Sequence, residues 1–208
     1  MNGAMVLKHP LIEHKLSIIR NKNTKTKEFR ETISEIAGLL TYEITRELKL
    51  KAKEVETPVA TTTCYELEQD VVIVPILRAG LGMVDGIHNL IPNAKIGHIG
   101  LYRDEKTLEA KEYYAKFPEN IANSTVLLID PMLATGNSTV KAISMLKEKN
   151  VSEIIFVGVV GCPEGVKNIN QAHPDVKIFL AALDEKLNKD GYIVPGLGDA
   201  GDRLFGTK

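Results

Sequence analysis

The chain has 208 residues, of which 44% are hydrophobic and 25% are charged. This composition fits one globular domain and excludes a disordered, collagen-like or disulfide-built protein. The 26 Lys and Arg residues nearly balance the 27 Asp and Glu residues, so we expect no nucleic acid as the main partner.

The sequence also argues against a membrane protein. Its longest apolar run, residues 154–162, is about half of the roughly 20 residues that a membrane span needs. The first residues lack the apolar block of a secretory signal, and the two cysteines, Cys64 and Cys162, lie far apart in the chain. We therefore expect a cytoplasmic protein with reduced thiols and no membrane partner.

Two amphipathic helices are predicted in the N-terminal part, residues 10–50. Over residues 26–50, apolar side chains recur every three or four positions from Phe29 to Leu48, which is the spacing of one helix face. A shorter helix is predicted over residues 11–20, with Pro10 suited to its first turn. The two helices imply a cap on the fold or a dimer contact.

After Pro58, short apolar runs alternate with helical segments. Runs this apolar indicate strands that are buried on both faces, and the alternation predicts an α/β fold in which helices flank a parallel sheet. We expect the whole chain, residues 1–208, to form one domain. The expected strands cover residues 71–76, 96–101, 125–129, 154–160 and 176–182. The clearest helix between them covers 139–149, and a weaker helical pattern covers 165–172.

Two stretches interrupt this alternation. Residues 104–120 are polar and long for a simple connection, so they predict a hairpin or flap. The flap could close over a ligand or serve as a dimer arm, and the sequence favours neither role. The C-terminal segment, residues 187–208, has five glycines and little periodicity.

The strongest chemical signal lies at residues 126–139. An apolar strand leads to Asp130, and the following loop opens a helix with free N–H groups and hydroxyls between Thr135 and Thr139. Such a helix N-terminus favours an anion, which predicts a phosphate site with Asp130 as the acceptor for sugar hydroxyls. The structural alternative is an Asx turn followed by a Ser/Thr-capped helix.

A second strand-to-loop junction lies at residues 71–82. Gly80 and Gly82 allow a close backbone approach to a ligand, and Arg78 supplies a planar cation. Arg103 follows the next predicted strand, so in a parallel sheet it would emerge at the same edge. This convergence predicts a diphosphate site, although each arginine taken alone is more typical of a surface ion pair.

Other chemical templates fail. Residues 196–201 match G-x-G-x-x-G, but no clear strand precedes them and too few residues follow for a βαβ unit. The phosphate-binding loop G-x-x-x-x-G-K-[ST], a zinc cluster and a nucleophile elbow are not found in the sequence. Positioning and electrostatics are therefore the expected means of catalysis.

Four segments together resemble the uracil phosphoribosyltransferase family, a branch of the type I phosphoribosyltransferases. The segments are residues 75–82 (PILRAGLG), 101–104 (LYRD), 128–138 (LIDPMLATGNS) and 192–203 (YIVPGLGDAGDR). The resemblance covers nearly the whole chain. It implies a parallel-sheet phosphoribosyltransferase core flanked by helices, with N-terminal helices and a hood built from the flap, residues 104–120, and the uracil-binding segment, residues 187–208.

The resemblance also implies an activity, namely the conversion of uracil and 5-phosphoribosyl 1-diphosphate to UMP and diphosphate with Mg²⁺. Catalytic roles fall on Arg78, Arg103 and Asp199, with the metal held through diphosphate and water near Asp199 rather than by direct ligands. Besides these three residues, the donor would contact Asp130, Pro131, Met132, Leu133, Ala134, Thr135, Gly136, Asn137 and Ser138. Uracil would contact Ile193, Gly198, Asp199 and Ala200.

One residue departs from the family pattern, because Asn137 stands where a second Gly is usual before the Ser. Asn adopts left-handed backbone angles more readily than most residues, so we expect the loop to survive. The family further implies a homodimer or homotetramer and, in some members, GTP as an effector.

Two alternatives from other classes stay open at this point. The first is a pyrimidine-sensing regulator on the same scaffold that binds RNA, against which the neutral overall charge argues. The second is a dinucleotide-dependent oxidoreductase that uses the glycine-rich matches.

Overall fold

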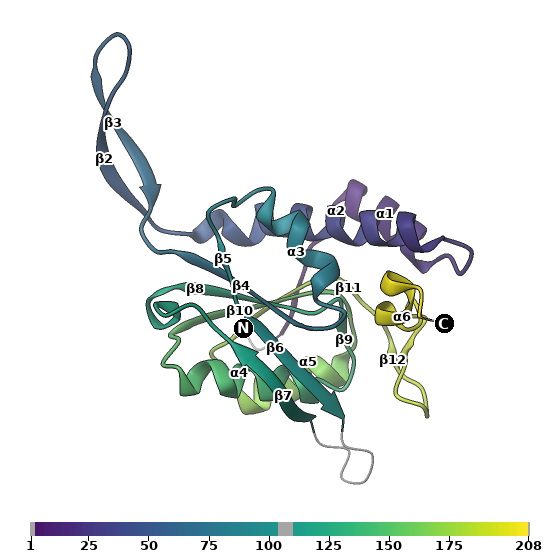
Figure 1. Cartoon of the computed structure of the whole chain (residues 1–208). Coiled ribbons are helices and arrows are strands. Elements are labelled where there is room, and N and C mark those ends of the chain that lie inside the picture. Colours follow the sequence, from purple (N-terminus) through teal and green to yellow (C-terminus); the bar gives the residue numbers. More distant parts are fainter. Residues whose placement is uncertain (1–2, 104–109, 208) are drawn as a thin grey trace.

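The computed structural model describes residues 3–103 and 110–207, and nine strands of this part form the central sheet (Figure 1). Seven of the strands form a continuous series. Outside this series, β5 (Lys95–Ile96) pairs with β4 (Val71–Leu77), and β9 (Met132–Leu133) pairs with β10 (Glu153–Gly161). The series runs in the order β1 (Met5–Val6), β11 (Lys177–Leu183), β10 (Glu153–Gly161), β8 (Thr125–Ile129), β4 (Val71–Leu77), β6 (His98–Arg103) and β7 (Ala110–Lys116).

The predicted parallel sheet is confirmed. Strands β4, β8, β10 and β11 pair in parallel, and β8 has the bounds expected from the sequence. The apolar run predicted as one strand at 96–101 is divided into β5 and β6. Strand β7, in the described part of the predicted flap, pairs antiparallel with β6 at one edge of the sheet.

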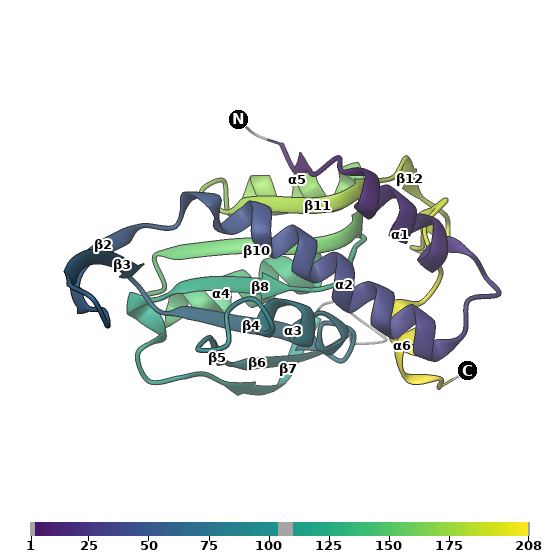
Figure 2. The same cartoon turned by 90° about the horizontal axis from the view of Figure 1, so that it is seen from above.

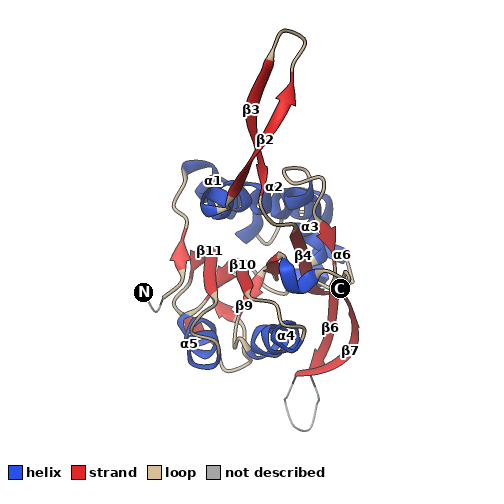
Figure 3. Cartoon of the chain, turned by 90° about the vertical axis from the view of Figure 1, so that its left-hand side faces the viewer, coloured by secondary structure: helices blue, strands red, loops and turns tan. Residues whose placement is uncertain are grey.

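Helices cover both faces of the sheet (Figures 2 and 3). One face carries α1 (Pro10–Arg20), α2 (Thr26–Ile44) and α3 (Leu81–His88), and the other carries α4 (Asn137–Glu148) and α5 (Pro163–Ala172). The N-terminal helices α1 and α2 therefore cover one face of the sheet, which agrees with the first of their two predicted roles, a cap on the fold.

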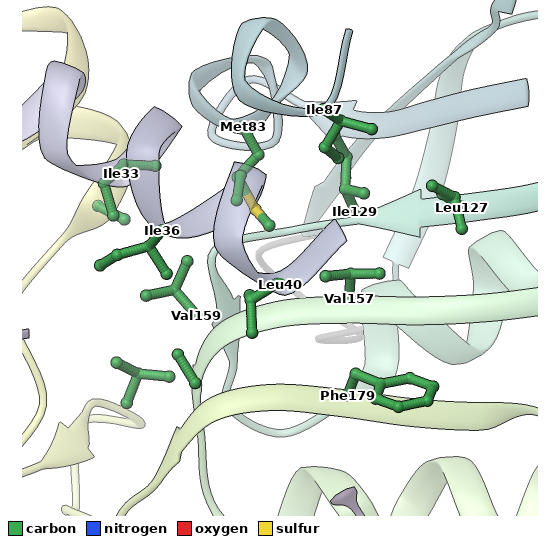
Figure 4. Close-up of a cluster of buried hydrophobic side chains, with 14 of the residues drawn as sticks. Ile33, Ile36, Leu40, Met83, Ile87, Leu127, Ile129, Val157, Val159 and Phe179 are labelled. Carbon is green, nitrogen blue, oxygen red and sulfur yellow. The ribbon is translucent and has the colours of Figure 1, made fainter. Parts of the chain in front are cut away.

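The core has two halves because alternate residues of a strand face opposite sides of the sheet. Leu127 and Ile129 of β8 join the cluster beneath α2 and α3, which Figure 4 shows. Val126 and Leu128 of the same strand join the cluster beneath α4 and α5. All five residues of β8 are inaccessible to solvent because both faces of the strand are covered. This packing holds the strand that precedes Asp130 in place.

The predicted helix over residues 26–50 is wrong at its C-terminal end. Helix α2 ends at Ile44, a short 3₁₀ turn follows at Thr45–Glu47, and the chain then enters β2 (Leu50–Glu56). This strand pairs with β3 (Thr61–Leu67) in an antiparallel hairpin, here called the arm, which projects far from the sheet (Figure 1). The arm has few buried side chains, so it leaves little trace in the hydrophobic pattern.

The C-terminal segment is more ordered than its glycine content predicts. Strands β12 (Lys186–Leu187) and β13 (Ile193–Val194) pair in a short antiparallel ladder, and α6 (Ala200–Phe205) follows. In the described part of the chain, no helix combines the length and the apolar character that crossing a membrane demands.

Candidate active site

The candidate site lies where the parallel strands end. Because β4, β8 and β10 run in the same direction, their carboxyl ends meet at one edge of the sheet, where open α/β sheets bind ligands. Figure 1 shows the C-terminal segment beside β9 at this edge. The site therefore combines strand ends with the last part of the chain.

Asp130 directly follows β8 and is partly exposed at this edge. Its Oδ1 accepts a hydrogen bond of 3.2 Å from the backbone N–H of Met132, which forms the Asx turn that the structural alternative required. Burial among the strand ends raises the pKa of the Asp130 carboxyl to about 7, and the bond from Met132 opposes this shift. With this pKa, the charge of the Asp130 carboxyl near neutral pH depends on what binds next to it.

The loop after Asp130 turns into α4 at Gly136. Gly136 has a φ of 79°, and a Cβ at this position would lie 2.9 Å from the carbonyl oxygen of Gly165, so both the angle and the space require glycine. Asn137 is the first residue of α4. The left-handed angle attributed to Asn137 is therefore a wrong expectation, because Gly136 adopts that angle and Asn137 is helical.

Arg78 follows β4, as predicted, and its side chain is exposed. The peptide bond between Leu77 and Arg78 is cis. The guanidinium carbon lies 5.8 Å from the centre of the Phe205 ring of α6, so Arg78 stands beside the C-terminal segment. Arg103 is the last residue of β6, but its side chain and the flap residues 104–109 lie outside the described residues.

The C-terminal segment reaches the sheet edge through α6. Asp199 caps this helix, since its Oδ1 accepts a hydrogen bond of 2.9 Å from the N–H of Asp202, and the rest of the carboxylate is exposed. Gly198 has a φ of 82°. The G-x-G-x-x-G match at residues 196–201 thus follows a two-residue strand and runs into a six-residue helix, which excludes a dinucleotide-binding βαβ unit.

Two arginines hold this segment in place. Arg20 forms a bidentate ion pair with buried Asp184 at 2.8 and 2.6 Å and also donates to the carbonyl of Gly196 at 2.8 Å. Arg203 donates to the carbonyls of Ile19, Leu197 and Asn21, and its guanidinium lies over the Phe29 ring. Desolvation by burial lowers the pKa of Arg203. Helices α1 and α2 therefore support the site, which the sequence did not indicate.

A cavity of about 250 Å³ lies between the two parts of the site. Of the predicted donor and uracil residues, it brings together Asp130, Met132, Ala134, Ile193, Gly198, Asp199 and Ala200. Arg78 is not among its lining residues. Leu133 ends β9, and the remaining predicted donor residues of this region belong to the adjoining loop or the start of α4: Pro131, Thr135, Gly136, Asn137 and Ser138. The residues that line it without having been predicted are Ala79, Gly191, Tyr192 and Gly201.

The cavity carries two carboxylates from sequence-distant segments, Asp130 and Asp199. Carboxylate oxygens suit Mg²⁺, which keeps several waters and binds through a few carboxylates and substrate phosphates. Among the residues that the structure describes, no group of three or more His, Cys, Asp and Glu side chains forms a metal cage. The donor set therefore fits Mg²⁺ held mainly by a phosphorylated substrate.

Solved structures define the class of protein to which this architecture belongs. Adenine phosphoribosyl transferase from Trypanosoma brucei has a TM-score of 0.56 at 14% identity, with 94% of this chain and 87% of that chain covered. A hypoxanthine-guanine phosphoribosyltransferase from Bacillus anthracis has a TM-score of 0.53 at 14% identity, covering 76% and 80% of the two chains. The fold is that of the type I phosphoribosyltransferases.

Closer relatives narrow the class to one family. The uracil phosphoribosyltransferase family model matches residues 6–207, and the uracil phosphoribosyltransferase of Acholeplasma laidlawii is 64% identical over the full length of both chains. A solved structure from Aquifex aeolicus is 39% identical with a TM-score of 0.93 and covers 97% of each chain. The chain belongs to the uracil phosphoribosyltransferase family, as its sequence motifs indicated.

Proposed function

We propose that the chain transfers a 5-phosphoribosyl group from 5-phosphoribosyl 1-diphosphate to N1 of uracil, which gives UMP and diphosphate and salvages the free base. Full-length similarity to the curated enzymes supports this activity. The observation that carries it is the single cavity shared by Asp130, after β8, and by Gly198 to Ala200 of the C-terminal segment. One cavity lined by both segments is what direct transfer between two substrates requires.

The donor occupies the strand side of the cavity in this proposal. Asp130 accepts hydrogen bonds from the ribose hydroxyls, and the N–H groups and hydroxyls between Ala134 and Ser138 bind the 5-phosphate. The left-handed angle of Gly136 supports this role because it lets successive N–H groups gather at the start of α4. Pro131, Met132 and Leu133 place this loop against β10.

Uracil occupies the side formed by Ile193, Gly198, Asp199 and Ala200. Backbone groups read the base edge, where uracil presents O4 as an acceptor and N3 as a donor. Cytosine reverses both, so its binding leaves buried polar groups unpaired, and the enzyme should reject it. The exposure of Gly198 supports this assignment, because a residue without a side chain leaves room for the flat base.

Transfer begins as the bond between the anomeric carbon and the diphosphate breaks. Arg78 and Arg103 stabilise the leaving diphosphate, and a donor placed to meet such developing charge contributes about 3 kcal/mol. Holding uracil N1 beneath the anomeric carbon supplies up to about 7 to 11 kcal/mol, with no enzyme-bound covalent intermediate. Asp199 holds water near the diphosphate. When bound, Mg²⁺ neutralises charge on the diphosphate.

Several features of the proposal concern the molecule as a whole. The chain acts as one domain, residues 1–208, in which the segment 187–208 shields the cavity from water. The flap, residues 104–120, either closes over the ligands or serves as a dimer arm. The arm projects from the rest of the molecule (Figure 3). Its exposed Leu50, Val59 and Tyr65 side chains support self-association as a homodimer or homotetramer. Activation by GTP stays a prediction from the family. The two free cysteines are compatible with a cytoplasmic location.

The test is the formation of labelled UMP from labelled uracil, 5-phosphoribosyl 1-diphosphate and Mg²⁺. We expect turnover with uracil, and at least about 100-fold less with cytosine because of its unpaired polar groups. Adenine and hypoxanthine serve as further comparison substrates because the structural neighbours include enzymes named for these bases. Turnover of a purine without turnover of uracil would contradict the proposal, as would binding of pyrimidine leader RNA without UMP formation.

A further inference from the structure

The predicted phosphate loop, residues 133–138, contacts the N-terminal part of α5. Three consecutive backbone carbonyls, those of Leu133, Ala134 and Thr135, accept hydrogen bonds from Cys162, the N-cap of α5, or from Asn168 of the helix. The N–H of Cys162 donates to Leu133 at 3.1 Å, and the Cys162 thiol lies 3.1 Å from the oxygen of Ala134. The Asn168 amide donates to Thr135 at 3.0 Å. Burial raises the pKa of the Cys162 thiol, which favours its role as an S–H donor.

The side-chain nitrogen Nδ2 of Asn168 donates two hydrogen bonds. Its Nδ2 also donates to Oδ1 of Asn137 at 2.8 Å, so the two hydrogens of one amide group bind both sides of Gly136. Gly165 allows the close approach that these bonds need, because a Cβ there would lie 2.5 Å from the carbonyl oxygen of Ala134. Asn137, the residue that departs from the family pattern, thus takes part in the contact.

The direction of these carbonyls fixes the direction of the N–H groups that follow them. In a trans peptide the C=O and N–H bonds point in opposite directions, and the peptide bonds of this loop are trans. With the carbonyls turned toward α5, the N–H groups of Ala134, Thr135 and Gly136 point away from it. Within the described parts of the chain, these three N–H groups have no hydrogen-bond acceptor.

We infer that Asn168 is a positioning residue for donor binding, and this inference rests on the proposed phosphate role of the loop. By holding the carbonyls of residues 133–135 against α5, Asn168 and Cys162 present three N–H groups to the 5-phosphate before the donor arrives. The loop then loses little freedom on binding. Asn168 itself does not touch the substrates.

The effect should appear in ground-state binding. The 5-phosphate is remote from the bond that breaks, so its contacts are the same before and during the reaction. Loss of the Asn168 bonds should therefore raise the KM for the donor about five- to tenfold, while kcat at saturating donor changes less than about twofold. The KM for uracil should not change.

The experiment compares Asn168→Ala with Asn170→Ala, which removes the same side chain from the same helix. The Asn170 side chain makes no hydrogen bond to another described residue. Calorimetry with ribose 5-phosphate and, separately, with diphosphate distinguishes the two ends of the donor. We expect Asn168→Ala to weaken ribose 5-phosphate about five- to tenfold and to leave diphosphate unchanged, whereas Asn170→Ala changes neither.

Two further variants separate the possible failures. Asn137→Ala keeps the bond to Thr135, so we expect a smaller loss of ribose 5-phosphate affinity, about two- to threefold. Gly136→Ala disrupts the loop itself. If Gly136→Ala weakens ribose 5-phosphate but Asn168→Ala behaves like Asn170→Ala, the positioning role is wrong and the phosphate site stands. If folded forms of both Gly136→Ala and Asn168→Ala bind normally, both assignments are wrong.

Discussion

Replacement of Asp130 by Asn should make the protein more stable at alkaline pH and inactive. In the folded chain, burial raises the pKa of this carboxyl from 3.8 to about 7. Between these two pH values the unfolded chain has released the proton that the folded chain still binds, so stability falls as the pH rises. The stability that protonated Asp130 contributes is complete below pH 3.8 and lost above about pH 7.

The size of the effect follows from the shift. Each pKa unit corresponds to about 1.4 kcal/mol, so the full shift of about three units is worth about 4 kcal/mol at most. Roughly 2 to 3 kcal/mol of this is lost between about pH 5 and about pH 8. Asn cannot ionise, so the variant does not lose this contribution. Relative to the unchanged protein, Asp130→Asn should therefore gain about 2 to 3 kcal/mol between the two pH values.

Urea unfolding of both proteins at each pH measures the change in their stability difference. The titration of all other groups affects both proteins equally and cancels. Donor binding provides the second readout, because the amide cannot accept from the ribose hydroxyls as a carboxylate does and can no longer contribute a charge. An equal stability difference at the two pH values would refute the raised pKa. Unchanged donor affinity would refute the role of Asp130 in binding.

Two further predictions concern the C-terminal segment. Gly198→Ala should cost about 1 kcal/mol of stability because φ is 82°, and it should raise the KM for uracil while donor affinity is kept. Gly206→Ala, with φ of 64°, is the control. Equal loss of uracil and donor affinity in Gly198→Ala would contradict the assignment. Arg203→Lys should cost about 1 to 3 kcal/mol in urea unfolding and raise the KM for uracil, since Lys cannot reach three carbonyls in a fixed fork. Exposed Arg46→Lys is its control, and similar behaviour of both variants would show that Arg203 does not support the segment.

The sequence predicted the strands well where burial is complete. All five residues of β8 are inaccessible to solvent, so the apolar run at 125–129 corresponds to the strand and places Asp130 at its end. Parallel pairing then brings Arg78 and Asp130 to one edge of the sheet without further information. This part of the site could be predicted because one physical rule, burial on both faces, determines it.

The arm could not be recognised by the same rule. Strands β2 and β3 are mostly exposed and are held by main-chain pairing and surface ion pairs, such as Lys53 with Glu66 at 2.9 Å. Leu48 extended the apparent helical pattern of α2 past its end at Ile44. A β-rich run at Thr61–Leu67, after the turn at Pro58, was the signal that could have identified the hairpin.

The C-terminal half of the site depends on contacts that local sequence patterns do not show. Helix α6 could have been recognised from its caps, Asp199 at the start and Gly206, with φ of 64°, at the end. The cavity itself could not, because Tyr192 and Gly201 line it from a segment that Arg20, distant in the sequence, contacts through Asp184 and Gly196. Family motifs supplied the assignment that residue patterns alone did not.

The most direct test of the account is a crystal structure of the protein with 5-phosphoribosyl 1-diphosphate and Mg²⁺. We expect the 5-phosphate on the N–H groups of residues 134–138, the ribose hydroxyls at Asp130, and the diphosphate toward Arg78. The space beside Gly198 should remain open for uracil. A donor bound elsewhere, or one whose 5-phosphate lies away from the start of α4, would contradict the central claim that this sheet edge and the C-terminal segment form one active site.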